Sequence, residues 1–466
     1  MISKSVAIEV LNKALETGAD YAEIFYENSM SDAITIENGK VSVASSKLTS
    51  GVGLRLLKEN QCIYGYTCDL TKKGLLKLAD DLNKSFNGER LLTVTKLEMI
   101  RGKNRSPIIN SYDNFTIEER IALLKEGIDE IEKMNDPRIV RYIGSFASSH
   151  RFVAIFNSKG KWFKRDTEFA RLAYSIITMD ENGMETGFEG PGAQEDISFF
   201  KNKINVRNVA RKAAEVAIMN LTAKECPSGK MPVVIGNGWG GVLFHEACGH
   251  PLEASAVSRG LSCFAGKLGE MIASPLVSAV DDSTIPNAWG SIDIDDEGNP
   301  GTKRVLIKNG VLTDFMIDDF NGRRMNREGN GSCRRQNYRY CPTSRMSNTY
   351  ICNGKSTKEE IIAATKLGLY AVGFSGGSVN PATGEFNFGC SEAYIIRDGK
   401  ICEPVKGATL IGKGEEILKK IDMVGNDLAL AQGMCGAASG SIRTNVGQPT
   451  IRLSEITVGG RGGELK

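Results

Sequence analysis

The sequence predicts an α+β fold in two domains, a mixed α/β domain over residues 1–225 and a β-rich domain over residues 226–466. Glycine is abundant, with 51 residues against 13 prolines, which favours many tight turns and a β-rich fold. Asn-Gly and Asp-Gly pairs separate alternating apolar runs, a pattern typical of β-hairpins. Several segments upstream of residue 225 have the apolar spacing of amphipathic helices.

Helices are predicted in the N-terminal half, where apolar residues recur every three or four positions. The first helix carries charged side chains at helical intervals, and we expect it to end at Gly18. Thr116 precedes a strongly amphipathic segment, and we expect its side chain to cap that helix. The three later helices are predicted over residues 71–86, 116–134 and 206–222.

Strands are predicted between and after these helices, because residues 20–68 and 138–180 and the C-terminal half show β signals. The apolar run MPVVIG at residues 231–236 predicts a buried strand. The domain boundary is placed near residue 225, at the Cys-Pro-Ser-Gly segment that follows the last helix. The predicted hairpin turns are Asn38-Gly39, Ser158-Lys159-Gly160, Asn309-Gly310 and Asp398-Gly399.

Composition narrows the class of protein. Hydrophobic residues make up 41% and charged residues 24% of the chain, which is ordinary for a soluble globular protein. The formal net charge is only +2 and the sequence shows no stripe of basic residues, so we expect no nucleic-acid partner. The sequence shows neither a long apolar run nor a signal-peptide pattern, which predicts a cytoplasmic protein without membrane contact. The eleven cysteines are expected to be reduced thiols.

The segment GGVLFHEACGH contains the residues best suited to chemistry. It holds His245, Glu246 and His250, and therefore two of the three histidines of the chain. Imidazole nitrogen is a favoured zinc ligand, and a glutamate beside a ligand can deprotonate a metal-bound water. We interpret this HExxxH motif as a metal site; the alternative is a helix start with incidental polar residues.

The five-residue spacing of the two histidines does not suit a regular helix. Side chains four residues apart lie within about 40° of each other around the helix axis, whereas those five apart differ by about 140°. Both histidines can bind one ion only if the helix contains a π-bulge or ends between them. Gly249 and Pro251 favour such a break, so we predict that the helix is irregular by residue 250.

The third metal ligand is left open by the residues themselves. A catalytic zinc site usually takes three protein ligands and a water, and His150, the eleven cysteines and many carboxylates are all candidates. Cys435, within GMCGAASG, is attractive because flanking glycines would leave its thiolate accessible on a loop. The alternative for Cys435 is a small buried apolar residue.

GGVLFHEACGHPLEAS resembles the signature of the TldD/PmbA family of metallopeptidases, on the TldD side that keeps the metal motif. Further matching blocks follow in the same order, and the resemblance is strong over residues 230–460 and weaker upstream. Many ordered blocks are more specific than the HExxxH motif alone. Among them are GSIDIDDEGNPG (290–301), GLYAVGFSGG (368–377) and MVGNDLALAQGMCG (423–436).

This resemblance implies a soluble zinc peptidase with an antiparallel, barrel-like C-terminal domain and the HExxxH helix near the domain boundary. It implies that Zn²⁺ is bound by His245, His250 and Cys435, and that Glu246 is the general base. Family members act as homodimers, or as heterodimers with a PmbA/TldE-like sister subunit that lacks the metal motif. The dimer encloses the active site, so the implied substrates are extended or unfolded peptides.

Two departures from the family pattern and two competing functions follow from the same residues. Cys248 replaces a small aliphatic residue and would place a second thiol near the zinc, and Pro251 replaces a common glycine. One alternative function is a non-catalytic modulator subunit, but such a subunit would have no use for an intact metal motif. Another alternative is a cysteine hydrolase that uses Cys248, but no residue is identified that would orient the histidine beside this thiol. The segment AVGFSGGSVN (371–380) is either a strand-addition site for an extended substrate or a turn-rich loop.

Overall fold

The computed structural model describes residues 1–181, 183–380 and 382–465, and its mixed α/β architecture confirms the predicted α+β class. One long sheet dominates the N-terminal half, in the order β3-β2-β1-β5-β6-β4, with β7 and β8 paired to β6. Its strands pair antiparallel except β4, which runs parallel to β6. They are β1 (Tyr21–Glu37), β2 (Lys40–Lys58), β3 (Gln61–Thr67), β4 (Glu98–Met99), β5 (Ile139–Asn157), β6 (Lys161–Asp180), β7 (Gly183–Glu189) and β8 (Gly192–Ala193).

The predicted hairpin turns are confirmed by the strand register. Glu37 pairs with Lys40 across Asn38-Gly39. Both turn residues have positive φ, 45° for Asn38 and 75° for Gly39, as a two-residue Asn-Gly turn between antiparallel strands requires. The turns predicted at residues 158–160, 309–310 and 398–399 also join paired antiparallel strands.

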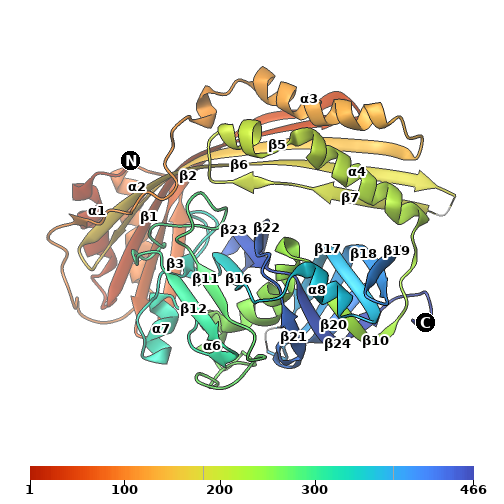
Figure 1. Cartoon of the computed structure of the whole chain (residues 1–466). Coiled ribbons are helices and arrows are strands. Elements are labelled where there is room, and N and C mark those ends of the chain that lie inside the picture. The colour runs from red at the N-terminus through yellow and green to blue at the C-terminus, as the bar shows by residue number, and fades with distance from the viewer. Residues whose placement is uncertain (182, 381, 466) are drawn as a thin grey trace.

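Four helices pack on this sheet (Figure 1). Helices α3 and α4 lie along its upper face, and α1 and α2 pack together at the opposite end of the long strands. Thr116 caps α3 through a capping box with Glu119, as predicted. The helices are α1 (Lys4–Ala14), α2 (Lys72–Asn83), α3 (Ile117–Met134) and α4 (Val206–Thr222).

The first helix is shorter than predicted, because α1 ends at Ala14 rather than at Gly18. The Thr17 hydroxyl donates a hydrogen bond to the backbone carbonyl of Asn83 on α2. Gly18 has a φ of +90°, a left-handed conformation that cannot continue the helix. Packing against α2 therefore decides where the first helix ends.

A closed barrel forms the core of the C-terminal half. β10 pairs with β24, β24 with β20, β20 with β18, β18 with β17, and β17 returns to β10. The predicted barrel-like domain is confirmed, and most of its strand pairs are antiparallel as predicted, but β17 closes the barrel by running parallel to β10. β10 covers residues 231–235 of the buried strand predicted at 231–236. The strands of this sheet are β9 (Lys224–Glu225), β10 (Gly229–Ile235), β17 (Leu367–Val379), β18 (Glu385–Arg397), β19 (Lys400–Lys406), β20 (Thr409–Lys413), β21 (Ile421–Val424) and β24 (Ile451–Gly459).

A second sheet of the C-terminal half lies next to the barrel, in the order β13-β12-β11-β16-β23-β22, and β14 and β15 form a separate ribbon. These strands are β11 (Ala279–Asp282), β12 (Lys303–Lys308), β13 (Val311–Leu312), β14 (Cys333–Arg334), β15 (Thr343–Ser344), β16 (Asn348–Ile351), β22 (Ala429–Ala437) and β23 (Gly440–Gln448). Short helices connect the strands, namely α6 (Ala254–Val257), α7 (Asp319–Met325), α8 (Lys358–Ala363) and α9 (Gly414–Ile417).

The two halves meet through buried ion pairs. Arg55 on β2 contacts Glu23 on β1 and Glu297 of the C-terminal half, with nitrogen–oxygen distances of 2.8 and 2.7 Å. All three side chains are at most 1% exposed, and Arg335 also contacts Glu23. Charges removed from water this completely must be paired, so these contacts hold the two halves in a defined orientation.

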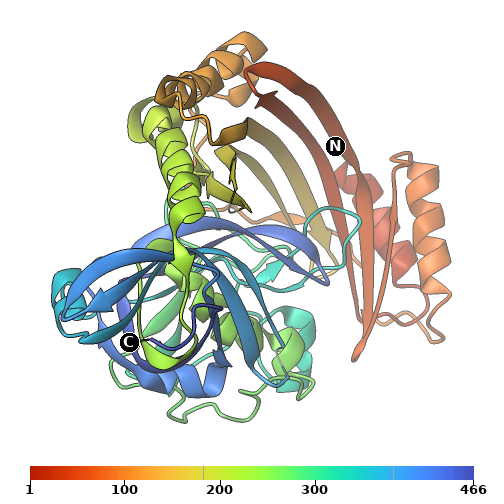
Figure 2. The same ribbon diagram turned by 90° about the vertical axis from the view of Figure 1, so that its right-hand side faces the viewer.

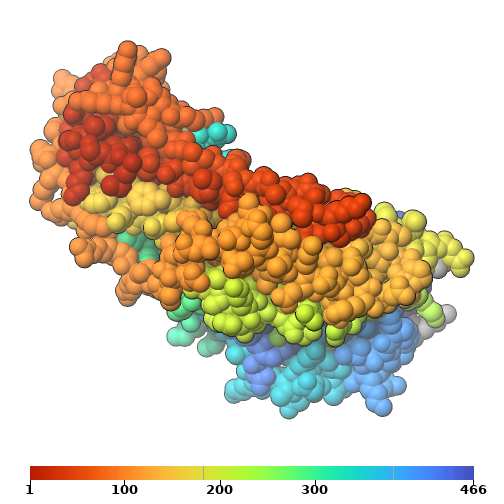
Figure 3. Space-filling view, turned by 90° about the horizontal axis from the view of Figure 1, so that it is seen from above, coloured from red at the N-terminus to blue at the C-terminus, as the bar shows by residue number. Residues whose placement is uncertain are grey.

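The long sheet arches over the C-terminal half (Figure 2). Seen from above, the N-terminal half covers much of the C-terminal half, whose cyan and blue residues emerge along one side (Figure 3). In the described parts of the chain, no helix has the length and apolar character needed to cross a membrane.

Candidate metal centre

The HExxxH residues lie in a helical segment whose backbone changes type twice. Helix α5 (Val242–Phe244) leads into the π-helix η4 (His245–Gly249), which is followed by the 3₁₀-helix η5 (His250–Leu252). The backbone N–H of His250 donates to the carbonyl of His245, five residues earlier, which closes a π turn. The prediction that the helix is irregular by residue 250 is confirmed, and the irregularity is a π-helical turn.

Two glycines allow this segment to pack closely against neighbouring elements. A Cβ on Gly249 would lie 2.2 Å from the sulfur of Met346, and one on Gly241 would lie 2.3 Å from the backbone nitrogen of Gly447 on β23. A Cβ on Gly241 would clash with backbone, and one on Gly249 would require the Met346 side chain to move. The segment carrying His245 is therefore fixed against β23, the partner strand of β22.

The structure brings His245, His250 and Cys435 together. The Sγ atom of Cys435 lies 3.3 Å from Nε2 of His245 and 3.3 Å from Nε2 of His250. The two imidazole rings are nearly perpendicular, with centroids 5.0 Å apart. The three potential ligand atoms lie within 4.8 Å of one another.

Cys435 reaches this site from a strand, so the predicted loop position is wrong. It lies in β22, opposite Ile442 of β23, and its side chain is only 5% exposed. Arg345 donates to the backbone carbonyl of Cys435 and, at 2.8 Å, to that of Gly440. The hairpin and this buried arginine hold the thiol in place, whereas the flanking glycines predicted an accessible thiolate on a loop.

The electrostatics of the site favour a thiolate. Burial raises the pKa of the Cys435 thiol. His245 and His250 lower this pKa by a larger amount, and the net result is a pKa of about 3. Burial lowers the pKa of His250, while Glu253 and Cys435 raise it, so that it lies well above its usual value. The thiolate is the form of cysteine that binds a metal ion.

Two glutamates flank His250 in different ways. An oxygen of Glu246 lies 3.8 Å from Nε2 of His250, on the side of the ring that faces Cys435. An oxygen of Glu253 lies 3.2 Å from Nδ1 of the same ring, and its other oxygen accepts a hydrogen bond from the backbone of Met346. Glu253 therefore orients the imidazole from behind, as carboxylates commonly do for metal-binding histidines.

This donor set fits a zinc ion. Bonds of about 2.0–2.1 Å to nitrogen and 2.3 Å to sulfur place tetrahedral nitrogen and sulfur ligands about 3.5 Å apart, close to the observed 3.3 Å. Two imidazoles and one thiolate are typical zinc ligands and leave a fourth position free. Among the described residues, Nδ1 of His245 has no hydrogen-bond partner, unlike Nδ1 of His250.

Two other sequence candidates lie elsewhere. Cys248 is completely buried in the apolar core, and its thiol is not among the gathered ligand atoms, so the expected second thiol at the metal is not there. Burial and the nearby Cys263 raise the pKa of Cys248 well above its usual value. His150 lies on β5, where it contacts Asp113 and Asp166 at 2.8 Å each.

Comparison with known proteins gives the family. The PmbA/TldA metallopeptidase family matches the chain in three parts, its domain 1 at residues 22–85, its central domain at residues 110–221 and its C-terminal domain at residues 228–460. The chain belongs to this family of metallopeptidases. The predicted PmbA/TldD membership and enzyme class are thereby confirmed, and HExxxH and Cys435 both lie in the part matched by the C-terminal domain.

Relatives in the PmbA/TldD family match almost end to end. A metalloprotease TldD homologue of Haemophilus influenzae is 35% identical over 467 residues, covering 98% of this chain and 97% of the relative. A Buchnera aphidicola homologue with the same description is 35% identical, covering 95% and 93%. A zinc metalloprotease TldD homologue of Saccharolobus solfataricus is 24% identical, covering 97% and 99%.

Solved structures share the fold. A Bacteroides thetaiotaomicron protein described as a candidate modulator of DNA gyrase superposes with a TM-score of 0.77 at 20% identity, covering 98% of both chains. TldE from Thermococcus kodakarensis superposes with a TM-score of 0.75 at 18% identity, covering 97% of this chain and 99% of TldE. At these identities the likeness shows the fold alone.

Sequence reasoning missed two residues that shape the candidate metal centre. Glu253 lies three residues after His250, a spacing that places a carboxylate behind the imidazole, and this local signal was available. Arg345 has no such signal, because it contacts the backbone of Cys435 only after the strands have assembled.

Proposed function

We propose that this chain is a zinc metallopeptidase in which His245, His250 and Cys435 bind the metal and Glu246 is the general base. The observation that supports it most directly is the convergence of two imidazole nitrogens and a cysteine sulfur within 4.8 Å, beside the carboxylate of Glu246. Membership of a metallopeptidase family supports the same function.

The chemistry divides between the metal and the chain. When bound, zinc acts as a Lewis acid and lowers the pKa of a coordinated water to about 7. Oε2 of Glu246 lies 3.8 Å from Nε2 of His250, and this carboxylate would serve as the general base that accepts a proton from the attacking water and returns it to the leaving amine. Glu253 keeps the ring of His250 oriented throughout.

An extended peptide suits the surroundings of this site. β17 is paired to β10 only over residues 369–371, whereas residues 373–379 pair with β18 on one side. An unpaired strand edge of this kind can accept a peptide as an additional strand, with backbone hydrogen bonds that are independent of sequence. We assign extended or unfolded peptides as the substrates, and β17 contacts the π-helix of the HExxxH motif.

The proposed assembly is a dimer in the cytoplasm that encloses the site, either a homodimer or a heterodimer with a TldE-like subunit. The likeness to TldE supports such a partnership. Sedimentation of the purified chain, alone and with a TldE-like partner, tests it. An active monomer, or rapid cleavage of a stably folded protein, would contradict the enclosed site.

We also propose that the domain boundary lies near residue 225. Helix α4 of the N-terminal half ends at Thr222, and β9 then joins β19 of the barrel sheet. Hydrogen exchange of the full-length chain should give α4 and β10 different opening free energies; a single shared value would contradict two separate units.

Metal analysis combined with cleavage-site mapping on a library of unstructured peptides tests the proposed function. One zinc per chain and cleavage that a chelator abolishes are expected. A purified chain with no metal and no cleavage would favour the alternative, a non-catalytic modulator subunit. Cleavage that resists chelators but is blocked by a thiol reagent would favour a cysteine hydrolase.

A further inference from the structure

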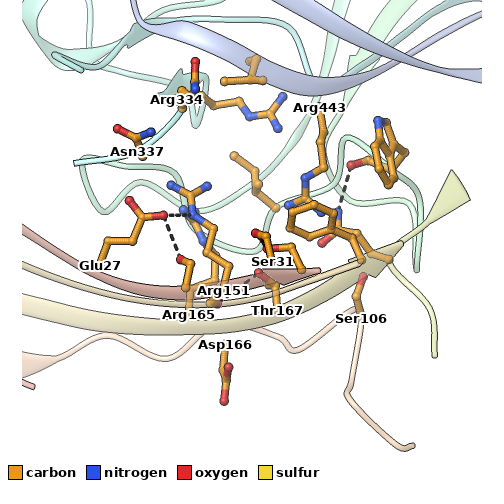
Figure 4. A pocket seen from close by; sticks show the side chains of 18 of the residues that line it. Glu27, Ser31, Ser106, Arg151, Arg165, Asp166, Thr167, Arg334, Asn337 and Arg443 are labelled. Carbon is orange, nitrogen blue, oxygen red and sulfur yellow. Dashed lines mark hydrogen bonds and ion pairs between the residues drawn. The ribbon is translucent and has the colours of Figure 1, made fainter. Parts of the chain in front are cut away.

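A large cationic pocket lies between the long sheet and the C-terminal half. Its volume is about 960 Å³, at the upper end of the range for ligand sites. Its walls come from β1, β5 and β6 on one side and from β22, β23 and the segments around residues 292 and 335 on the other. Figure 4 shows Arg334 and Arg443 reaching into it opposite Arg151 and Arg165.

The pocket carries an excess of positive charge. Nine lysine and arginine side chains line it against five aspartate and glutamate side chains, although the whole chain has a net charge of only +2. Asp166 points away from the pocket and contacts His150 on the other side of the sheet (Figure 4). Each of the other four acids already has an arginine partner, in the pairs Glu27–Arg151, Asp32–Arg120, Asp293–Arg105 and Asp296–Arg165.

Arg443 and Arg334 are left without an acidic partner. Among the described residues, neither guanidinium has a carboxylate oxygen within 4.0 Å, and the buried Nη1 of Arg443 has no hydrogen-bond partner. Arg334 is 7% exposed, and its Nη1 donates to the backbone carbonyl of Met346 at 2.6 Å. A buried cation without an anion costs free energy, so the site is prepared for a negative charge that the chain itself does not provide.

The like charges in the pocket act on one another. Burial lowers the pKa of Arg443 well below its usual value, and Arg151, Arg334 and Arg165 lower it further. Burial, followed by the nearby Arg345, also lowers the pKa of Arg334, to about 9. An anion bound between these groups would relieve this repulsion, which is the physical reason to expect affinity.

Aromatic side chains hold Arg443 in a fixed orientation. Its guanidinium lies 3.5 Å from the ring centroid of Phe169 and 5.5 Å from that of Trp289, and the two rings meet edge to face. The indole N–H of Trp289 donates to the backbone carbonyl of Gly433 on β22. A guanidinium stacked in this way presents its edge, which is suited to planar, bidentate recognition of a carboxylate.

The pocket is directly linked to the strand that carries Cys435. Met434 pairs with Arg443 and lines the pocket, whereas the next pair along the hairpin is Cys435 with Ile442. Successive side chains of a strand point to opposite faces, so β22 presents Met434 to the pocket and Cys435 to the histidines. Met434 is 53% exposed, and the pocket is open to solvent there.

We propose that this pocket binds a carboxylate of an acidic peptide, with Arg443 and Arg334 as the charge partners, and that the enzyme therefore prefers substrates with acidic residues. The proposal rests on the peptidase function only for its choice of a peptide as the source of the carboxylate. A free dicarboxylate has the same chemistry, and the experiment separates the two sources.

Binding to the zinc-loaded Glu246→Gln protein, which should not cleave the ligand, tests the site. Calorimetry and tryptophan fluorescence, to which Trp289 contributes, are used with N-acetylated, C-amidated Ala-Glu-Glu-Ala, its equally capped neutral analogue Ala-Gln-Gln-Ala, glutarate and inorganic phosphate. The acidic peptide should bind roughly 10- to 100-fold more tightly than the neutral one, because a hydrogen-bonded charge pair contributes about 1.5–3 kcal/mol.

Arginine variants in the same background locate the effect. Arg443→Gln and Arg334→Gln should each weaken binding of the acidic peptide about tenfold or more and leave the neutral peptide unchanged. The control is Arg452→Gln, which removes an arginine paired with Asp422 outside this pocket and should have no effect. Arg443→Gln removes a repelled cation but also its contacts with Phe169 and Trp289, so the unfolding temperature of each variant is measured to separate loss of binding from misfolding.

Three outcomes would overturn the proposal. Equal affinity for the acidic and neutral peptides would exclude a carboxylate site. Unchanged acidic-peptide binding in both arginine variants would place it elsewhere. Glutarate or phosphate binding as tightly as the acidic peptide would identify a free anion as the ligand. Cleavage without a preference for acidic peptides would contradict the carboxylate site but not the peptidase function. Binding of the acidic peptide by a chain that proves inactive would contradict the peptidase function but not the carboxylate site.

Discussion

Cys435 and His245 are 190 positions apart in the chain, yet Sγ of the first lies 3.3 Å from Nε2 of the second. The contact exists because the helical segment that starts at Gly238 packs on β23, while β22, which pairs with β23, carries the cysteine. The candidate metal centre is therefore assembled between a π-helix and a β-hairpin, and both must be in place before the three side chains meet.

Replacing Glu246 by glutamine should leave the metal bound and remove cleavage. The amide keeps the size of the side chain but cannot accept the proton, and loss of a general base costs roughly 10²–10⁴ in rate. Zinc content and peptide turnover of the variant are the measurements. The control is Glu328→Gln, which changes an exposed glutamate. Turnover within about tenfold of the parent protein would remove Glu246 from the mechanism.

Cys435→Ala and Cys248→Ala form a matched pair. The first should sharply lower zinc affinity and abolish cleavage, because it removes the thiolate that faces both histidines. The second should keep zinc and activity, since the thiol of Cys248 is completely buried in the apolar core. Competition with a chromogenic chelator measures the affinities. Tight zinc binding by Cys435→Ala would show that another residue is the third ligand.

His150 should make stability depend on pH. Burial lowers the pKa of its imidazole, but Asp113, Asp166 and Glu168 raise it more, so the folded-state pKa lies above the usual 6.5. Protonated His150 therefore stabilises the fold fully below about pH 6.5, and this contribution disappears as pH rises through the folded-state value.

Urea unfolding of His150→Gln at several pH values checks this. The variant should lose stability relative to the parent protein at pH 5.5, and the difference should shrink towards pH 9. Asp166→Asn, which removes one of the contacts at 2.8 Å, should flatten the dependence of the parent protein. A destabilisation by His150→Gln that is the same at all pH values would contradict the ion pairs.

Arg55→Ala should strongly destabilise the protein. The substitution leaves the buried Glu297 without its arginine, whereas Glu23 keeps Arg335, and breaking a buried pair in this way costs about 3–5 kcal/mol. Guanidinium unfolding monitored by tryptophan fluorescence measures it. Lys96→Ala breaks the exposed pair with Glu98 and should have no measurable effect. Equal effects of the two variants would show that the buried network does not hold the two halves together.

Local signals in the sequence predicted much of the fold. The turn at Asn38-Gly39 was predictable because an Asn-Gly pair adopts positive φ at low cost, and the start of α3 because the Thr116 side chain satisfies a free N–H of the first turn. The irregular helix was predictable because five-residue spacing, Gly249 and Pro251 all oppose a regular α-helix. Each of these depends on interactions among residues close together in the chain.

Only the tertiary structure decided the remaining features. Cys435 was singled out by resemblance, but the buried position of its side chain on β22 depends on the pairing of β22 with β23 and of β23 with β16. The end of α1 depends on a contact with Asn83, and the pocket around Arg443 exists because the long sheet is held over the C-terminal half by Arg55. These contacts join residues far apart in the chain, so their energies arise only once the whole topology is formed, and no local pattern records them.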